Sequence, residues 1–311
     1  MKVHLIHNPK AGGASGPDAD ELVKAIRQAG HEVTYQSSQK AHWQETLDKP
    51  ADLLAVAGGD GIVGKVARLC LNRAVPIAVL PMGTANNIAK TLGLMDLPLE
   101  QLIAGWATGH RQGFDVGVAD GPWGREFFVE GLGTGLFGSA LFRLETGAGP
   151  NPIASNDPDK ELQAARQYLV EHLQSYPAQT LQIKLDDEEL SGDYLLVEIM
   201  NIRSIGPNVV LAPEADSGDG LLDFVIVSAR ARDALMEQIQ DQSAEAVVFS
   251  GLAVHRGRHL QIWGKGLHVH IDDRVWPEDD AKSSTSPFLI KAGVLAQALS
   301  FLVPAKKESA D

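Results

Sequence analysis

Residues 53–69, LLAVAGGDGIVGKVARL, and residues 76–94, PIAVLPMGTANNIAKTLGL, decide the fold of this chain. Each segment begins with a short apolar run, continues through a glycine turn and ends in a pattern of helical spacing. An apolar run without alternation is typical of a parallel strand that is buried on both faces. The two segments therefore predict two strand–turn–helix units of a parallel α/β sheet.

The same alternation extends toward the N-terminus. Short runs that contain β-branched residues, at residues 3–6 and 32–36, predict two further strands, and residues 19–29 predict a helix that ends before Gly30. The glycine turn at residues 82–84 is expected to open a helix that runs through Leu92. These residues form the first part of the chain, and they predict an α/β domain.

After about Asp115 the pattern changes to short alternating strands separated by turns, which is typical of an antiparallel β-sandwich. We expect an α/β domain over residues 1–116 and a β-sandwich domain over residues 117–287. Residues 288–305, which read as a core helix or strand, are expected to return to the first domain.

The glycine turns are suited to phosphate binding. Glycine lets the backbone approach a ligand closely, and the free amides at the start of the following helix face an anion. Ligands of open α/β sheets bind at the carboxyl ends of the strands. Two such turns on neighbouring strands therefore predict a phosphate chain held between them.

Composition excludes several classes of function. The formal net charge of -13 and the pI near 5.2 argue against nucleic acid as a partner, and against a permanent electrostatic hold on anionic lipid. Cys70 is the single cysteine, so no disulfide can form within the chain, which suits a reducing compartment. No apolar run approaches the length needed to span a bilayer.

Three motifs together resemble the diacylglycerol kinase catalytic family, which includes bacterial lipid kinases, sphingosine kinases and ceramide kinases. They are GGDG at residues 58–61, PMGTAN at residues 81–86 and PEADSGDGLLD at residues 213–223. HNPKAGG at residues 7–13, FDVGVAD at 114–120 and FFVEGLGTGLFG at 127–138 match further segments. The resemblance covers nearly the whole chain. It implies an α/β plus β fold: a Rossmann-like domain of the NAD kinase and diacylglycerol kinase type, followed by an antiparallel β-sandwich domain.

The resemblance also implies that ATP and its Mg²⁺ are held by the first domain. The residues at matching positions are Asn8, Ser37, Gly58, Gly59, Asp60, Gly61, Ile62, Gly83, Thr84 and Asn86. Asp60 would act catalytically near the phosphates and Mg²⁺, and the alternative is a side chain that stabilises its own turn. The alternative for Thr84 is a plain helix N-cap.

The second domain supplies two further sites by the same resemblance. Asp272 in HVHIDDRVWPE matches the general base that takes the proton of the lipid hydroxyl. Asp219 matches a side-chain ligand of a structural Mg²⁺ or Ca²⁺, to which Asp216 and Leu221 would contribute carbonyl oxygens. The alternative for this loop is a solvated acidic turn.

The sequence departs from the family pattern at three places. Ile62 stands where the family has threonine, Asn87 stands where many members have aspartate, and Asp273-Arg274 replaces Gly-Glu. Asp115 could replace the acidic group that is missing at position 87. The departures motivate the hypothesis of a catalytically weak or inactive nucleotide- or lipid-binding protein.

Taken together, the sequence predicts an ATP-dependent lipid kinase. It would transfer the γ-phosphate to a primary hydroxyl of a diacylglycerol-like, phosphatidylglycerol-like or sphingoid lipid. The alternative enzymatic function is that of an NAD kinase-like enzyme. We expect a cytoplasmic protein, peripheral at the inner membrane face, that reaches its lipid by transient membrane contact. The sequence is compatible with a homodimer and does not decide the oligomeric state.

Two patterns have competing interpretations. His268 and His270 are two residues apart on an expected strand, so they could belong to a metal site, but ordinary histidines are favoured because zinc needs three or four converging ligands. Residues 135–144, GLFGSALFRL, could line a lipid pocket or touch a membrane, and core packing is the alternative.

Overall fold

The computed structural model describes residues 1–12, 16–149, 158–240, 247–248, 252–278 and 286–305. The chain divides into two compact units, Met1–Phe114 with Gln297–Asp311, and Asp115–Ala296. The expected boundaries lay at residues 116 and 288, so the second unit begins slightly earlier and extends further than the sequence indicated.

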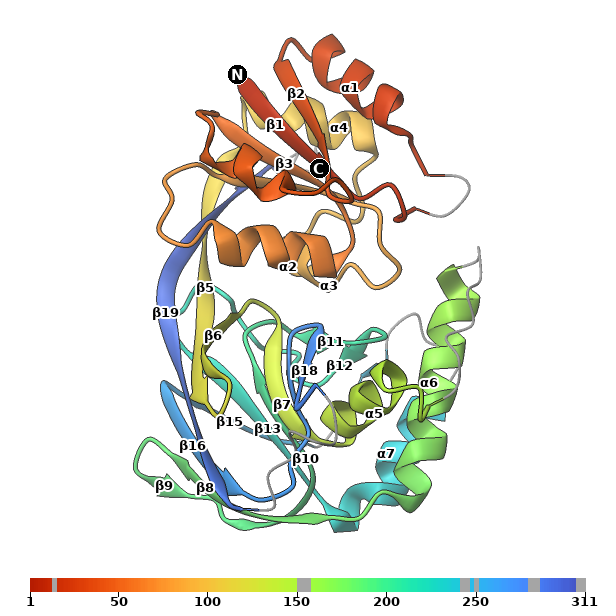
Figure 1. The fold of residues 1–311 in the computed structure, drawn as a ribbon, viewed down its shortest axis with the longest axis vertical. Coiled ribbons are helices and arrows are strands. Elements are labelled where there is room, and N and C mark those ends of the chain that lie inside the picture. Colours follow the sequence, from red (N-terminus) through yellow and green to blue (C-terminus); the bar gives the residue numbers. More distant parts are fainter. Residues whose placement is uncertain (13–15, 150–157, 241–246, 249–251, 279–285, 306–311) are drawn as a thin grey trace, which may run out of the picture. The chain divides into compact units, whose positions relative to one another are not determined.

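The first unit is built on a parallel sheet (Figure 1). Its strands are β1 (Lys2–His7), β2 (Glu32–Ser37), β3 (Leu53–Gly58) and β4 (Ile77–Pro81), in the spatial order β2–β1–β3–β4. Its helices are α1 (Ala19–Gln28), α2 (Asp60–Leu69), α3 (Asn87–Thr91) and α4 (Leu99–Ala104), with 3-10 turns η2 (Trp43–Asp48) and η3 (Gly105–Ala107). Every residue of β3 is buried, which confirms the expected buried parallel strand.

Two helices begin at other residues than the sequence predicted. Helix α2 starts at Asp60, directly after Gly59, whereas the helical pattern of residues 62–71 predicted a start at Ile62. Helix α3 starts only at Asn87, whereas we expected the turn at residues 82–84 to open it. Asn86 has a φ of 52°, which lies outside the helical region, so the chain needs these extra residues to turn into α3.

The second unit consists mainly of antiparallel β-structure, with one parallel pairing of two short strands, and its described residues include three helices (Figure 1). Its shorter strands are β6 (Gly124–Phe128), β7 (Gly131–Gly135), β9 (Glu188–Glu189), β11 (Ser204–Ile205), β12 (Val209–Val210), β14 (Val247–Val248), β15 (Ala253–Gly257), β17 (Val269–Ile271) and β18 (Arg274–Trp276). The longer ones are β8 (Gln179–Leu185), β10 (Gly192–Met200), β13 (Leu222–Ser228) and β16 (His259–Gly264). The helices are α5 (Leu136–Glu145), α6 (Pro158–Ser175) and α7 (Arg232–Gln240), with the 3-10 turn η4 (Ala229–Ala231).

Strand β10 is central to this unit, because it pairs with β7, β8 and β13. Strand β7 also pairs with β17, and β13 pairs with β15. All of these pairings are antiparallel, as expected. Helix α7 was missed by the sequence reading.

Strands β5 (His110–Gly121) and β19 (Phe288–Val303) each run through a boundary between the units. The C-terminal apolar segment is therefore a strand, which decides between the two structures that we considered for it. Near its end β19 pairs in parallel with β4, at Phe301 and Ile77. In the part of the chain that the structure describes, no helix is both long and apolar enough to cross a membrane.

Candidate active site

The two glycine turns of the first unit lie directly against each other. If Gly83 carried a β-carbon, that atom would lie 2.4 Å from the α-carbon of Gly59. The amide of Met82 also donates to the carbonyl oxygen of Gly58 at 3.0 Å. A side chain at Gly83 would collide with the other turn. Glycine at this position therefore lets the two backbones approach each other at the carboxyl ends of β3 and β4.

The carboxylate of Asp60 joins the first turn to the second. Its Oδ2 accepts the Asn87 amide and its Oδ1 accepts the Ile88 amide, both at 2.9 Å. These are the first amides of α3. The side chain of Asn86, the N-cap residue, does not accept from them, so Asp60 satisfies these donors instead. Burial raises the pKa of Asp60, and the two amides oppose that rise. Asp60 thus has the turn-stabilising contacts that we considered. A carboxylate offers about four acceptor positions, more than these two amides occupy, so the residue also fits a role beside Mg²⁺.

Asn86 holds the second turn together. Its Nδ2 donates to the carbonyl oxygen of Gly83 at 2.6 Å, and its Oδ1 accepts the Gly83 amide at 2.8 Å. Thr84 is exposed and lies three residues before α3. Our alternative for Thr84, a plain helix N-cap, is therefore wrong, and its contact with the nucleotide stays a prediction.

The remaining nucleotide-site candidates lie at neighbouring strand ends. Asn8 directly follows β1, and its amide donates to the carbonyl oxygen of Ala57 at 2.9 Å. A β-carbon at Gly58 would lie 3.4 Å from the β-carbon of Asn8. Ser37 is the last residue of β2, opposite His7 of β1, and it is buried. Asn8 and Ser37 therefore occupy the same edge of the sheet as the glycine turns.

Ile62 packs on the first turn. The position that a β-carbon of Gly58 would occupy is 2.3 Å from Cγ2 of Ile62, so this side chain depends on the glycine. Gly61 is exposed in the first turn of α2. All ten expected nucleotide-site residues thus lie at the carboxyl ends of β1, β2, β3 and β4, where a ligand of such a sheet is expected.

In the second unit, Asp272 occupies the turn between β17 and β18, and its carboxylate is bound by backbone amides. Oδ1 accepts the amides of Glu130 at 2.9 Å, Val129 at 3.0 Å and Gly131 at 3.3 Å. The Asp272 amide returns a hydrogen bond to the carbonyl oxygen of Gly131 at 2.8 Å. The side chain is therefore held in one orientation, in a residue that is only 8% exposed.

The two departures beside Asp272 have structural explanations. Asp272 itself has a positive φ of 52°, whereas Asp273 does not, so the turn does not require glycine at position 273. Arg274 pairs with Oε2 of Glu126 on β6 at 3.0 Å. The arginine that replaces the family's glutamate is thus engaged in an ion pair on the neighbouring strand.

A buried glutamate–histidine pair lies next to this turn. Nε2 of His270 is 2.7 Å from Oε2 of Glu198, and both side chains are almost fully buried. Both residues lie opposite Gly133, which separates them on β7. A β-carbon at Gly133 would lie 2.0 Å from Oε2 of Glu198, so only glycine leaves room for the carboxylate to reach His270.

The partners of this pair indicate how many protons it holds. Nδ1 of His270 is 3.3 Å from the carbonyl oxygen of Asp272, which can only accept, so Nδ1 carries a proton. A second proton is shared between Nε2 and Glu198. Burial raises the pKa of Glu198. Burial alone would lower the pKa of His270, but Glu198 outweighs it and the pKa is raised. The pair therefore retains both protons and stays neutral as a unit.

The metal interpretation of His268 and His270 is not supported. His270 is engaged with Glu198, and the ring of His268 stacks on Phe142 of α5 at 4.0 Å. The described ranges of the chain contain no group of three or more His, Cys, Asp or Glu side chains that could hold a metal ion.

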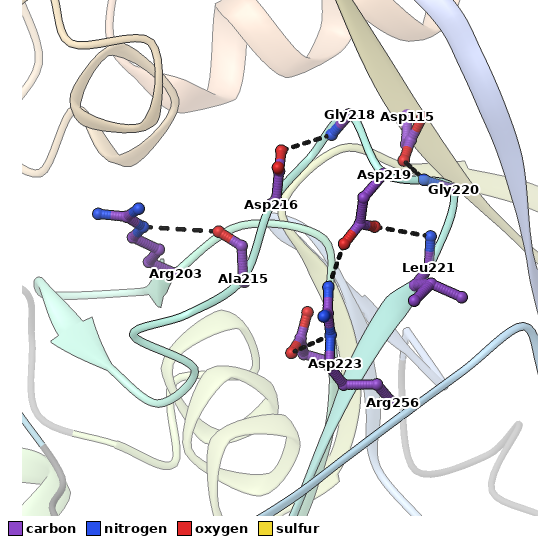
Figure 2. Close-up of polar contacts among 10 residues, drawn as sticks. All are labelled: Asp115, Arg203, Ala215, Asp216, Gly218, Asp219, Gly220, Leu221, Asp223 and Arg256. Atoms are coloured by element: carbon purple, nitrogen blue, oxygen red, sulfur yellow. Dashed lines mark hydrogen bonds and ion pairs between the residues drawn. The ribbon is translucent and has the colours of Figure 1, made fainter.

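The acidic loop before β13 is held by its own backbone and by Asp115 (Figure 2). Oδ1 of Asp216 accepts the Gly218 amide at 3.0 Å, and Oδ1 of Asp219 accepts the Leu221 amide at 2.9 Å. Oδ2 of the fully buried Asp115 accepts the amide of Gly220 at 2.7 Å. Asp115, considered above as a substitute acid for Mg²⁺, has the role of an anchor for this loop.

The side chain of Arg256, on β15, supplies a positive charge to this loop. The guanidinium of Arg256 forms an ion pair with Oδ2 of Asp219, and its Nε is 3.3 Å from Oδ1 of the buried Asp223 (Figure 2). Burial raises the pKa of Asp223 to about 6. Arg256 opposes this rise, while Asp219 and Asp216 add to it.

The residues expected to bind a structural metal do not fit that role in this arrangement. Both oxygens of Asp219 are engaged, one by the Leu221 amide and the other by Arg256. Mg²⁺ requires several oxygens in near-octahedral geometry, and Ca²⁺ requires six to eight.

Hydrogen bonds connect this loop to the segment that holds Asp272. Nδ2 of Asn201 donates to the carbonyl oxygens of both Asp115 and Val129, each at 2.9 Å. Asp115 binds the acidic loop, and the Val129 amide binds Asp272. Asn201 is 2% exposed, so this connection is shielded from water.

Helix α5 belongs mainly to the core, as the alternative for residues 135–144 predicted. Leu136, Phe137 and Phe142 are buried, the first two in a cluster with α6 and β10. A cavity of about 700 Å³ opens beside Phe142, with Tyr168, His172 and other residues of α6 in its wall. The lining combines aromatic rings with polar groups.

Several of these residues were not identified from the sequence. Glu198 had a signal, because it is the only charged residue in the apolar run at residues 194–200. Arg256 had none. Asp223 ends the motif at residues 213–223, but nothing local indicates that it faces Arg256. Asn201 and Gly133 are likewise defined only by their neighbours in space.

Comparisons with known proteins agree with these features. Residues 2–119 match the model of the "Diacylglycerol kinase catalytic domain", and residues 156–292 match that of the "YegS C-terminal NAD kinase beta sandwich-like domain". The chain is 30% identical over 250 residues to a "Probable lipid kinase YegS-like" of Chromohalobacter salexigens, covering 76% of this chain and 75% of that protein.

Solved structures support the same fold. A diacylglycerol kinase from Bacillus anthracis str. Sterne superimposes with a TM-score of 0.65 at 19% identity, covering 97% of this chain and 96% of that chain. Yeast NADH kinase complexed with NADH gives a TM-score of 0.52 at 10% identity, covering 99% and 84%. The predicted α/β domain and antiparallel β-sandwich domain are thus confirmed.

Proposed function

Because the chain belongs to the YegS-like lipid kinases, which carry a diacylglycerol kinase catalytic domain, we propose that it transfers the γ-phosphate of ATP to a hydroxyl group of a lipid. In the reaction, the lipid oxygen forms a bond to the γ-phosphorus as the bond to the leaving oxygen of ADP breaks. The proton of the hydroxyl passes to a protein carboxylate.

The observation that carries this proposal is the fixed carboxylate of Asp272. Amide donors favour the charged form of a carboxylate, and several donors on one oxygen also set its direction. A base for a lipid hydroxyl has to be deprotonated and held in one direction. The geometry of Asp272 suits this role, because Oδ1 accepts three backbone amides and the turn is anchored to Gly131.

The glycine turns of the first unit support the nucleotide half of the reaction. We propose that the backbone amides near Gly59 and Gly83 bind the phosphates, and that Asn8, Ser37 and Thr84 contact the remainder of the nucleotide. Mg²⁺ would neutralise charge on the phosphates, and Asp60 is the residue of this unit that would hold it. The protein contributes mainly positioning and charge stabilisation, as is usual for phosphoryl transfer.

The acceptor remains the open part of the proposal. We propose that acyl chains enter the second unit, where the cavity beside α5 and α6 provides space with aromatic walls. The lipid would be met at a membrane surface by transient contact. The likeness to yeast NADH kinase concerns the fold alone, so NAD is retained as an acceptor to be tested.

The test is transfer of labelled γ-phosphate from ATP·Mg²⁺ in mixed micelles, with a diacylglycerol, a monoacylglycerol, phosphatidylglycerol, a sphingoid base and NAD as separate acceptors. Asp272→Asn removes the base, and Asp273→Asn is the matched control, because it changes an exposed acid in the same turn. We expect labelled lipid from the wild type and from Asp273→Asn, and at least a hundredfold lower turnover from Asp272→Asn, since general base catalysis contributes about 10²–10⁴-fold.

Label in NAD alone would replace the lipid kinase assignment with an NAD kinase assignment. Binding of ATP without transfer to any acceptor would favour a nucleotide-binding protein that has lost activity. Equal losses in the two aspartate variants would refute the role of Asp272.

A further inference from the structure

The acidic loop and its neighbouring strand bring one arginine and three carboxylates together. Strands β13 and β15 pair antiparallel, and their register places Arg256 directly opposite Asp223. Asp219 and Asp216 lie in the loop that leads into β13. Strand pairing therefore fixes the backbone positions of Arg256 and Asp223 beside each other, within reach of an ion pair between their side chains.

The geometry of Arg256 resembles that of a bridging cation. One nitrogen pairs with Oδ2 of Asp219, and Nε faces Oδ1 of Asp223 at 3.3 Å. The side chain of Asp223 is only 3% exposed and that of Asp219 is 26% exposed, so both carboxylates need a counter-charge close by. The guanidinium is suited to this, since it presents several donors in one plane and is always charged.

We propose that Arg256 takes the place of a divalent cation in this loop, so that the folded loop does not depend on Mg²⁺ or Ca²⁺. The guanidinium joins Asp219 to Asp223. The amides of Gly218 and Leu221 donate to Asp216 and Asp219, and Asp115 accepts the amide of Gly220. A metal ion could bind here only if it displaced the arginine from Asp219. The inference is independent of the phosphate-transfer reaction.

The first part of the test compares the wild-type protein with and without divalent metal, in the absence of nucleotide. Urea unfolding, followed by circular dichroism, is measured in a chelator, in Mg²⁺ and in Ca²⁺. We expect the same denaturation midpoint in all three. A midpoint that falls in the chelator, or heat of Mg²⁺ or Ca²⁺ binding that disappears in Asp219→Asn, would overturn the proposal.

The second part removes the guanidinium. Arg256→Met keeps most of the side-chain length and loses the charge. We expect the folding equilibrium constant to fall roughly tenfold, because the buried Asp223 loses its partner; the fall is smaller than for a fully buried pair, since the arginine side chain is 43% exposed. Excess Mg²⁺ or Ca²⁺ should restore part of this loss, since the loop then offers carboxylates without an internal cation. A loss that neither metal restores would show that the arginine does not replace a metal.

Arg125→Met is the matched control. It removes the guanidinium from the exposed pair of Arg125 with Asp120, which lies in the same unit. We expect a small loss that metal does not change, because exposed pairs contribute little. If Arg256→Met is too unstable to purify, Arg256→Lys replaces it. Because lysine retains the charge, the denaturation midpoint of this variant should be the same with and without the chelator. A midpoint that depends on metal would refute the proposal.

Discussion

Replacing Gly133 with alanine should strongly destabilise the second unit. The new β-carbon would lie 2.0 Å from Oε2, 2.1 Å from Cδ and 2.2 Å from Oε1 of Glu198, whereas contacts under 3.0 Å essentially never occur. The carboxylate would have to leave His270, although both side chains are buried. Overpacking costs about 1–3 kcal/mol, and breaking a buried pair costs about 3–5 kcal/mol. Since one displacement causes both effects, we expect a loss of about 3–5 kcal/mol in the free energy of unfolding.

Urea unfolding at neutral pH measures this loss, and Gly293→Ala is the control. A β-carbon at Gly293, on β19, would find its nearest neighbours at 3.4–3.8 Å, which is ordinary contact. Alanine is favoured over glycine inside a strand by about 0.5–1 kcal/mol, so this control should be neutral or slightly stabilising. In a Glu198→Ala background, Gly133→Ala should cost much less. Equal effects of the two alanine substitutions, or an undiminished cost in that background, would refute the reasoning.

Two further predictions concern stability. Burial, with smaller contributions from Arg143 and His268, lowers the pKa of His172 to about 4, from an ordinary 6.5. The neutral form of His172 therefore stabilises the fold above pH 6.5, and the free energy of unfolding falls by at most about 3 kcal/mol as the pH falls to 4. His172→Gln should flatten this part of the curve of stability against pH. A curve that the substitution leaves unchanged would contradict the role of His172. Asp60→Asn should cost about 1–2 kcal/mol in urea unfolding, because an amide cannot accept from both helix-start donors of α3. Asp18→Asn, at the N-cap of α1, should cost less, since asparagine caps a single amide well, and a similar loss in both variants would argue against the double acceptor role.

The sequence located the two glycine turns at the ends of β3 and β4 correctly, because their signals are local. An apolar run followed by glycines defines the end of a strand wherever it occurs, and residues 58–62 and 83–86 lie where this pattern placed them. The start of α3 was predicted wrongly. The residue that satisfies its first amides is Asp60, which lies 27 positions away from Asn87 and so leaves no trace in the local pattern.

The second unit illustrates the limit more clearly. Asp272 was found by its motif, but the amides that orient it come from residues more than 140 positions earlier. Its neighbour His270 looked like a surface or metal-binding histidine until the pairing of β10, β7 and β17 placed Glu198 across Gly133.

The sequence by itself determined the alternation of strands and helices in the first unit, the glycine turns and the position of the candidate base. These features depend on residues that are close along the chain. The tertiary structure alone decided which side chains share a charge or a proton, because antiparallel pairing brings distant residues into contact and register selects the pairs. For that reason the acidic loop could suggest a metal site in sequence, while the strand opposite supplies the cation, Arg256, in the fold.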